Sequence, residues 1–285
     1  MIRRPPRSTQ SRSSAASDVY KRQGEYIMIQ VHVTYQFESG IPYAAASVNA
    51  PVEKLDDALE YASKGVNARY LQNMWPNKAP NVHSYIGKQE EQLHPLKIVG
   101  NVGNLFATGN SFGFITLVKD IIPILIKKLG KGKFEIHLFG GGKPHKLVAP
   151  LLKDPHIKLR GFVDDIDSEI TSAPIFLVAN NSQNFKVGHT RFLHAWSLKA
   201  CIVGFLDSSE AMPEIVHGEN ALLGESSEQV ADLIIQAAQD SELRQKISMG
   251  GTKTLNNFFS PIKVMDEMIN DIDNSLKFQN NKTIK

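Results

Sequence analysis

From residue 96 onward, short apolar runs alternate with segments whose apolar positions recur every three or four residues. The runs are typical of buried β-strands, and the longer spacing is typical of helices with one apolar face. Strands are expected at residues 97–103, 133–139, 157–159, 174–179, 201–205 and 219–223. Helices are expected at residues 112–129, 145–152 and 241–257, from 227, from 260, and between the loop at 186–190 and the strand at 201. This alternation predicts an α/β fold, a Rossmann-like parallel sheet with flanking helices over residues 96–274.

Local signals refine the ends of these helices. Pro123 lies inside the first helix and is expected to kink it, because proline lacks the N–H that an interior turn needs. Asp164 and Ser227 precede helical segments and are expected to act as N-caps. Ser260 followed by Pro261 combines a cap with a favoured first-turn proline, so a further helix should begin there.

Before residue 96 the pattern is less regular. The expected elements are a strand at 27–33, an amphipathic helix at 51–65 and a strand at 66–71. Residues 73–95 are polar and dotted with prolines, which is typical of a linker. Residues 24–72 are too few for an ordinary α/β domain, so we expect the remnant of an amino-terminal domain whose start is missing. Residues 275–285 are expected to fray.

Residues 1–23 differ in composition from the rest of the chain. They hold six Arg or Lys residues against one Asp, show no apolar periodicity and lack the apolar core of a secretory signal. They resemble translated sequencing-adapter read-through, so we expect an artefact and a truncated protein. Subtracting their charge of +5 from the formal +3 of the whole chain leaves −2 for the remainder. That balance gives no argument for binding nucleic acid or an anionic membrane.

The cysteine content and the hydropathy of the chain argue against a disulfide-bonded or membrane-spanning protein. Cys201 is the only cysteine, so no intramolecular disulfide is possible, and its apolar neighbours predict a core residue. No apolar run approaches the roughly 18 residues that a membrane span needs. We therefore expect a cytoplasmic protein without a membrane span.

The expected strands end in small or polar residues. The strand ends carry Gly103-Asn104, Gly140-Gly141-Gly142, Gly161-Phe162-Val163, Asn180-Asn181 and the loop with Gly188. Ligands of open α/β sheets bind beyond the carboxyl ends of the strands, where glycines let phosphate approach the backbone. Several such loops in one domain favour a nucleotide or phosphosugar site over simple tight turns.

The stretch from Lys186 to Gly204 offers the clearest anion signal. Gly188, Thr190 and Arg191 stand at an expected helix start, where unpaired amides, the helix dipole and a cation favour a negative charge. The alternative is an ordinary surface helix cap, and the stretch alone does not decide between them.

Familiar cofactor and metal patterns are not matched. Gly140-Gly141-Gly142 fits neither the dinucleotide fingerprint nor the Walker pattern. The run Asp164-Asp165-Ile166-Asp167 looks like a DxD metal motif, but its place before a helix favours capping. His189 and His194 are five residues apart and do not share a helical face. We expect no metal and no cofactor.

The order of these signals carries a family resemblance. The succession FEIHLFGGG, IKLRGFVDD, PIFLVANN, GHTRFLHAWSLKACIVG and MPEIVHGENALL resembles the carboxy-terminal domain of GT-B glycosyltransferases of the group 1 (GT4) kind. The resemblance covers about residues 96–273. It implies two Rossmann-like domains with a nucleoside diphosphate sugar in the cleft between them, held mostly by the second domain, and no metal.

The resemblance also implies roles for individual residues. On the diphosphate side of the cleft it places Gly103, Asn104, Thr108, Gly109 and Asn110, and Gly141 is also assigned to donor binding. Beside the nucleobase it places Phe162 and Val163, and facing the donor sugar and phosphates it places Gly188, His189, Thr190 and Arg191. The family's usual two glutamates, eight residues apart, correspond here to Lys186 and His194. Since the second glutamate normally contacts the ribose, His194 is assigned to donor binding, and Lys186 or Arg191 is expected to compensate the negative charge.

The leading hypothesis is a glycosyltransferase that moves a sugar from a UDP- or GDP-sugar to an unidentified acceptor. The family alone implies a retaining, metal-independent reaction. One alternative is a GT-B-fold nucleotide-sugar epimerase, for which Glu210 and Glu214 are the candidate acid and base. Another is a non-catalytic fragment that only binds the nucleotide sugar.

Overall fold

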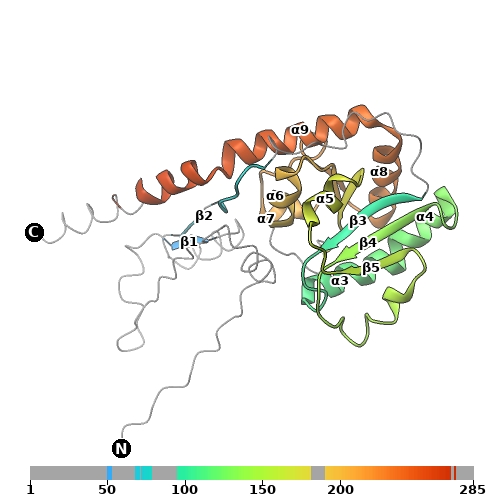
Figure 1. The fold of residues 1–285 in the computed structure, drawn as a ribbon. Coiled ribbons are helices and arrows are strands. Elements are labelled where there is room, and N and C mark those ends of the chain that lie inside the picture. The colour runs from blue at the N-terminus through green and yellow to red at the C-terminus, as the bar shows by residue number, and fades with distance from the viewer. Residues whose placement is uncertain are drawn as a thin grey trace, which may run out of the picture.

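A six-stranded parallel sheet is the centre of the structure (Figure 1). The computed structural model describes residues 50–52, 68–70, 72–78, 95–180, 190–270 and 273. The strands are β3 (Leu96–Val102), β4 (Phe134–Phe139), β5 (Ile157–Gly161), β6 (Ile175–Val178), β7 (Ile202–Phe205) and β8 (Leu222–Gly224). The predicted Rossmann-like parallel sheet is confirmed.

The order of the strands creates one special edge. The strands lie in the order β5-β4-β3-β6-β7-β8, so the chain moves outward from β3 through β4 to β5 and then returns to the other side of β3. Ile98 of β3 pairs with Ile175 of β6 at this reversal. In open parallel sheets the crevice beyond the carboxyl ends of two such strands is the usual ligand site. The topology therefore places the expected site beyond the ends of β3 and β6.

Two hydrophobic cores lie on opposite faces of the sheet, because successive strand residues point to opposite sides. The first core packs against α3 (Thr108–Thr116), the π-helical turn η3 (Leu117–Ile121), α4 (Ile122–Leu129) and α8 (Ser227–Gln239). The second packs against α5 (Ile166–Thr171), α6 (Thr190–Ser197) and the second half of α9 (Ser241–Phe258). Further described elements are η4 (Leu151–Lys153), α7 (Ser208–Ala211), a helix over residues 261–270, and the parallel pair β1 (Ala50–Val52) and β2 (Ala68–Tyr70).

The first helix differs from the prediction in its first residue and in the way it accommodates Pro123. It begins at Thr108 rather than at residue 112, so residues predicted to lie in a loop form its first turn. Pro123 is accommodated by a π-helical turn just before it, in which the N–H of Ile122 bonds the carbonyl of Leu117. The wider turn changes the hydrogen-bonding register next to the residue that has no N–H to give.

Other predicted boundaries shift for local reasons. The predicted helix at 145–152 is wrong: turns and the short helix η4 stand there, because Pro150 lacks the N–H that a helix interior needs. Asp165 rather than Asp164 caps α5, and Ser226 rather than Ser227 caps α8. The last predicted strand begins at Leu222, three residues after the predicted start at residue 219. The helix expected after Ser260 is present over residues 261–270.

The amino-terminal predictions are tested only in part. Residues 1–49 and 271–285, apart from residue 273, lie outside the described residues, and so do the expected strand at 27–33 and most of the helix at 51–65. Pro51 and Val52 belong to strand β1 rather than to that helix, whereas β2 lies within the strand predicted at 66–71. The first part of the predicted linker is packed, since Trp75 is buried and its backbone N–H bonds the carbonyl of Phe259 at 2.8 Å.

Two whole-chain expectations can be compared with the described residues. Cys201 is buried in the first core, as predicted, and burial raises the pKa of its thiol to about 12. No helix in the described part of the chain is long and apolar enough to cross a membrane.

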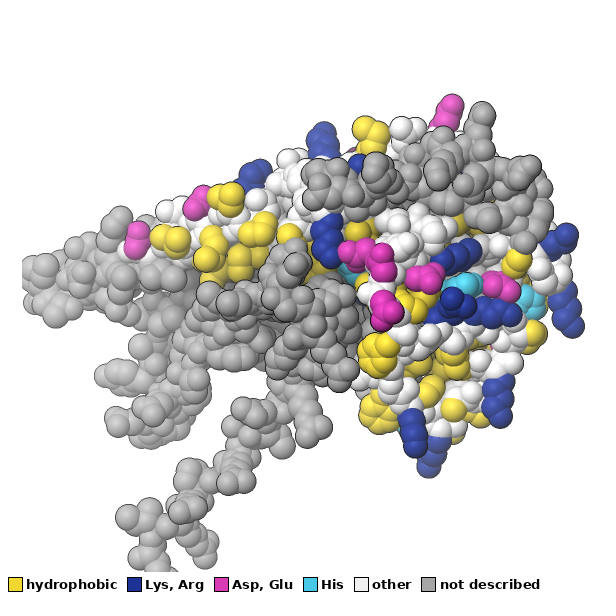
Figure 2. Space-filling view, viewed as in Figure 1, with side chains coloured by type: hydrophobic (Ala, Val, Ile, Leu, Met, Phe, Trp, Pro, Cys, Tyr) yellow, Lys and Arg dark blue, Asp and Glu magenta, His cyan; other side chains and the backbone are white. Residues whose placement is uncertain are grey.

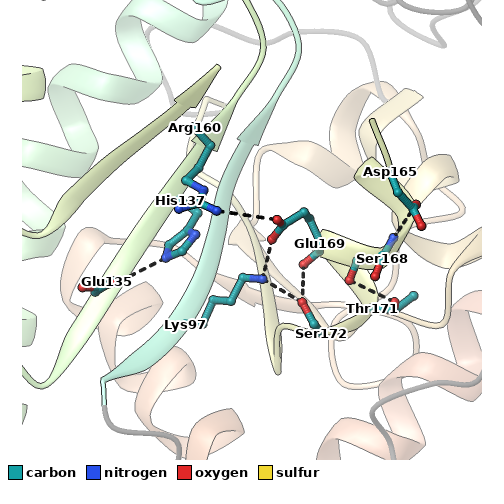
Figure 3. Close-up of polar contacts among 9 residues, drawn as sticks. All are labelled: Lys97, Glu135, His137, Arg160, Asp165, Ser168, Glu169, Thr171 and Ser172. Carbon is teal, nitrogen blue, oxygen red and sulfur yellow. Dashed lines mark hydrogen bonds and ion pairs between the residues drawn. The ribbon is translucent and has the colours of Figure 1, made fainter. Parts of the chain in front are cut away.

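A network of mixed charges covers the second face of the sheet beside β4 and β5 (Figure 3). Lys97 of β3 binds Glu169 of α5 at 2.7 Å, and Arg160 lies 3.8 Å from the same carboxylate. On β4, Glu135 lies 3.2 Å from His137 and 3.3 Å from Lys158 of β5. Figure 2 shows adjoining basic, acidic and histidine side chains in this region. These ion pairs hold α5 to the sheet and place charge along the edge strand β5, which discourages pairing with a foreign strand.

Candidate functional site

The loops that follow β3 and β4 are joined to each other and to the end of β5 by backbone hydrogen bonds. The N–H of Gly103 bonds the carbonyl of Phe139 at 3.0 Å, and the N–H of Leu105 bonds Gly141 at 2.9 Å. The N–H of Gly140 bonds Gly161 at 2.8 Å. The loops after β3 and β4 and the last residue of β5 therefore form one continuous backbone surface at the carboxyl ends of the strands.

Glycine is required where these loops touch. Gly140 has a φ of +120°, and a Cβ there would lie 1.9 Å from the carbonyl oxygen of Gly103. A Cβ on Gly141 would lie 2.2 Å from the ring of Phe162. The glycine run thus brings two of the predicted site loops into direct backbone contact and packs the third, through Phe162, against them.

Asn110, in the first turn of α3, connects two parts of the predicted site. Its Nδ2 donates to the carbonyl of Asn104 at 2.6 Å, and its Oδ1 accepts a hydrogen bond from the Arg191 guanidinium. The side chain is 4% exposed, and both ends of its amide are engaged. Asn110 was predicted to line the diphosphate side; its contacts show a residue that positions Arg191 and the loop at Asn104.

Arg191 is a cation without an acidic partner among the described residues. It is the second residue of α6, and its only hydrogen bond there goes to Asn110. Surrounding protein lowers the pKa of the guanidinium to about 10, which still leaves it protonated at neutral pH. A desolvated charge is costly unless it is paired. The guanidinium has several further N–H donors in a planar fork that matches phosphate or carboxylate, so this position is suited to an anion.

His194, three residues later on α6, belongs to a different cluster. Its Nε2 lies 2.9 Å from Oδ1 of Asp167, and Lys78 binds the other oxygen of that carboxylate at 2.7 Å. The ring centroid of His194 is 5.9 Å from that of Trp75. The structure therefore directs His194 toward α5 and the segment 72–78 rather than toward Asn110. Its predicted contact with a ribose stays a prediction.

The ion pair at Asp167 gives a pH-dependent prediction. Partial burial opposes ionisation of this carboxyl, but hydrogen bonds from His194 and Lys78 outweigh it and lower the pKa to about 2 from 3.8. The ionised form therefore stabilises the fold above about pH 4, and this contribution is lost as the pH falls toward 2. We expect Asp167→Asn to reduce the free energy of unfolding at pH 6 by about 1–2 kcal/mol, allowing for solvent screening of the partly exposed pair.

Urea denaturation of the wild type and Asp167→Asn at several pH values measures this effect. The gap between them should narrow as the pH falls from 5 toward 2. The matched control is Asp165→Asn, because an N-cap asparagine keeps the acceptor that bonds the Ser168 N–H. A gap for Asp167→Asn that stays constant with pH would contradict the ion-pair account.

The other predicted site residues are distributed as follows. Thr108 and Gly109 stand in the first turn of α3, and Thr190 is the first residue of α6. The side chain of Phe162 is 71% exposed, whereas Val163 packs against the second core. Lys186, Gly188 and His189 lie outside the described residues.

The acidic candidates have structural partners. Asp165 caps α5 by accepting the Ser168 N–H at 2.9 Å, and Asp167 is ion-paired. Glu214, proposed for the epimerase alternative, accepts a hydrogen bond from Gln72 at 2.9 Å, and Glu210 stands in the short helix α7. No group of three or more His, Cys, Asp or Glu side chains among the described residues could hold a metal ion.

Sequence reasoning missed two long-range contacts. Arg191 and Asn110 are 81 residues apart, and Lys78 and Asp167 are 89 residues apart. No local signal links either pair. The contact between Arg191 and Asn110 follows only from the reversal of strand order, which brings the starts of α3 and α6 to the same edge of the sheet.

Comparison with known families and structures gives one family match. The family model described as Glycosyl transferases group 1 matches residues 96–240, about half of the 285-residue chain. That range covers all six strands of the main sheet, α3 to α8 and the loops described above. No curated protein matches the chain.

Solved structures of similar fold are distant in sequence. A glycosyltransferase from Rickettsia africae ESF-5 superposes with a TM-score of 0.64 at 14% identity, over 86% of this chain and 69% of that chain. A mutant of S. aureus TarM, in complex with Fondaparinux, alpha-GlcNAc-glycerol and UDP, gives 0.59 at 15% identity, over 78% of this chain and 43% of its own. Anabaena Alr3699/HepE, in complex with UDP and glucose, superposes with a TM-score of 0.57 at 15% identity, over 80% of this chain and 63% of that chain. At these identities the likeness establishes the fold, and this chain spans less than half of TarM.

Proposed function

This chain belongs to the glycosyl transferases group 1 family, and on that premise we propose that it takes part in transferring a sugar from a nucleoside diphosphate sugar to an acceptor. The observation that carries the proposal is Arg191, a partly buried cation whose hydrogen bond goes to the neutral Asn110 and which has no acidic partner in the described part of the chain. Asn110 holds it at the switch point of the sheet, where ligands of this fold bind. A diphosphate supplies the negative charge that this position lacks.

The proposed reaction breaks the bond between the anomeric carbon of the donor sugar and the oxygen of the distal phosphate. The nucleoside diphosphate leaves with the bonding electrons, and an acceptor oxygen bonds the anomeric carbon and loses its proton. Negative charge grows on the leaving diphosphate as positive charge spreads over the sugar ring. Arg191 and the backbone amides at the starts of α3 and α6 would stabilise that diphosphate.

We propose that charge compensation by Arg191 replaces a metal ion. The supporting observation is that the acidic run before α5 is already engaged, because Asp165 caps the helix and Asp167 binds Lys78 and His194. We also propose that the transfer retains the configuration at the anomeric carbon, as the family resemblance implies. The exposed ring of Phe162, packed over Gly141, is the proposed neighbour of the nucleobase.

Binding of UDP or GDP to the full chain tests this function. A ligand present at 100 times its dissociation constant stabilises a protein by about 2.7 kcal/mol. For a domain of this size we expect the unfolding midpoint to rise by about 5 °C or more. Uridine, guanosine and inorganic phosphate are the controls, and each should produce a much smaller shift because none offers the diphosphate together with the nucleoside. No shift with either diphosphate would contradict the proposal.

A further inference from the structure

Asn180 is a buried residue whose side-chain carbonyl oxygen makes no hydrogen bond. It follows β6 directly, its side chain belongs to a residue that is 5% exposed, and its Oδ1 is buried with no hydrogen-bond partner. Leaving such a group unpaired costs about 1–3 kcal/mol. Buried polar atoms without partners are uncommon in native proteins, and one at a ligand-binding edge calls for an explanation.

The position of Asn180 is set by close packing against α3. A Cβ on Gly113 would lie 2.8 Å from both Cα and Cβ of Asn180, so only a glycine lets the helix approach this closely. Asn110 lies three residues before Gly113 and therefore on the same face of the helix. Because Asn110 bonds Arg191, the Asn180 amide lies beneath α3 about one helical turn from the proposed diphosphate position.

Two other buried side chains with an unpaired polar atom, Asn101 and His137, are held through their other polar atom. Asn101 also has an unpaired Oδ1, but its Nδ2 contacts the carbonyls of Gly103 and Phe139 and so supports the loops. His137 has an unpaired Nδ1, but its other ring nitrogen is held by Glu135. Asn180 lacks such an engagement within the described residues and, unlike Asn101 and His137, it follows a strand at the switch point.

We propose that the Asn180 amide binds a hydroxyl group of the donor, an inference that rests on the proposed function. An amide presents one acceptor and two donors, and a hydroxyl is likewise donor and acceptor, so the two match without any charge. Arg191, held by Asn110 one turn away along α3, suits the diphosphate. Hydroxyl groups flank a diphosphate on both sides, on the ribose and on the sugar. Asn180 would then distinguish donors by a hydroxyl, while Arg191 supplies charge.

Calorimetric titration of the full chain with UDP, UDP-glucose, GDP and GDP-mannose tests the inference. For the base that the wild type prefers, we expect Asn180→Ala to weaken binding of the nucleotide sugar by about 10-fold, which corresponds to the loss of one hydrogen bond. If the variant loses the same affinity for the nucleoside diphosphate as for the nucleotide sugar, the contact is to the ribose. If it loses affinity only for the nucleotide sugar, the contact is to the sugar. Unchanged affinity for both ligands overturns the inference.

The unfolding midpoint of the free protein separates binding from structure. Because Oδ1 makes no hydrogen bond and its burial is costly, Asn180→Ala should lower the midpoint by no more than about 2 °C. Asn180→Leu, of similar size, is the second variant if alanine prevents folding, and it should show the same loss of affinity. A lower midpoint with unchanged affinity would make Asn180 structural and overturn the inference. A wild type that binds none of the four ligands would instead contradict the proposed function.

Discussion

Replacing Arg191 with alanine is expected to weaken binding of UDP or GDP by about 100-fold. The guanidinium is partly buried and, among the described residues, has only the neutral Asn110 as its partner, so a bound diphosphate would be its only counter-ion there. Truncating one member of a buried, hydrogen-bonded charge pair costs about 2–5 kcal/mol, and about 2.7 kcal/mol corresponds to 100-fold. Calorimetric titration of the full chain measures the change.

Two further variants make this test specific. Arg191→Lys keeps the charge but loses the planar fork of donors, so it should recover only part of the affinity. Arg160→Ala is the matched control, because it removes a partly exposed arginine that is 3.8 Å from Glu169 and away from the switch point. Equal affinity for the Arg191→Ala variant and the wild type would remove the central support of the proposed site.

Replacing Gly140 with alanine is expected to cost about 3 kcal/mol of folding free energy and to abolish detectable nucleotide binding. Its φ of +120° is a conformation that alanine rarely adopts, which costs about 1–3 kcal/mol. The new Cβ would also lie 1.9 Å from the Gly103 carbonyl oxygen, and overpacking of this kind adds about 1–3 kcal/mol. Relief of that clash must move the loop after β3, which carries Asn104. Chemical denaturation and titration with UDP or GDP measure the two effects.

Gly130→Ala is the matched control for that variant. Gly130 ends α4 with a φ of +102°, but a Cβ there would meet only Lys133 Cγ at 3.5 Å. We expect the backbone cost alone, about 1–2 kcal/mol, with unchanged nucleotide affinity. If the two variants lose the same stability and bind nucleotide equally well, the contact between the loops of β3 and β4 does not matter for the site.

The strands could be predicted because each is a short apolar run that must be buried on both faces of the sheet. The first residues of the helices were harder to predict from the sequence. Gly109 and Asn110 have low helix propensity, so they read as a loop, yet packing of Gly113 against Asn180 draws them into α3. Asp164 and Asp165 are equally good caps by sequence, and only the path of the chain after β5 selects the second.

The site could be predicted as a set of loops but not as a set of contacts. Gly103, Asn104, Asn110 and Arg191 were assigned to one site through the family resemblance, and the structure brings them together. The orientation of α6 decides which partners its side chains contact, because it directs Arg191 toward α3 and His194 toward α5. Neither side-chain direction nor the ion pair with distant Lys78 is encoded in a local pattern, because both depend on packing between segments far apart in the chain.

Hydrogen exchange of the full chain with and without saturating UDP or GDP tests the central claim most directly. The claim is that a nucleoside diphosphate binds at the switch point between β3 and β6. It predicts slower amide exchange in residues 103–110, at the start of α3, and in residues 190–193, at the start of α6, with no change in α9. Protection confined to other segments, or no protection at any nucleotide concentration, would contradict the claim.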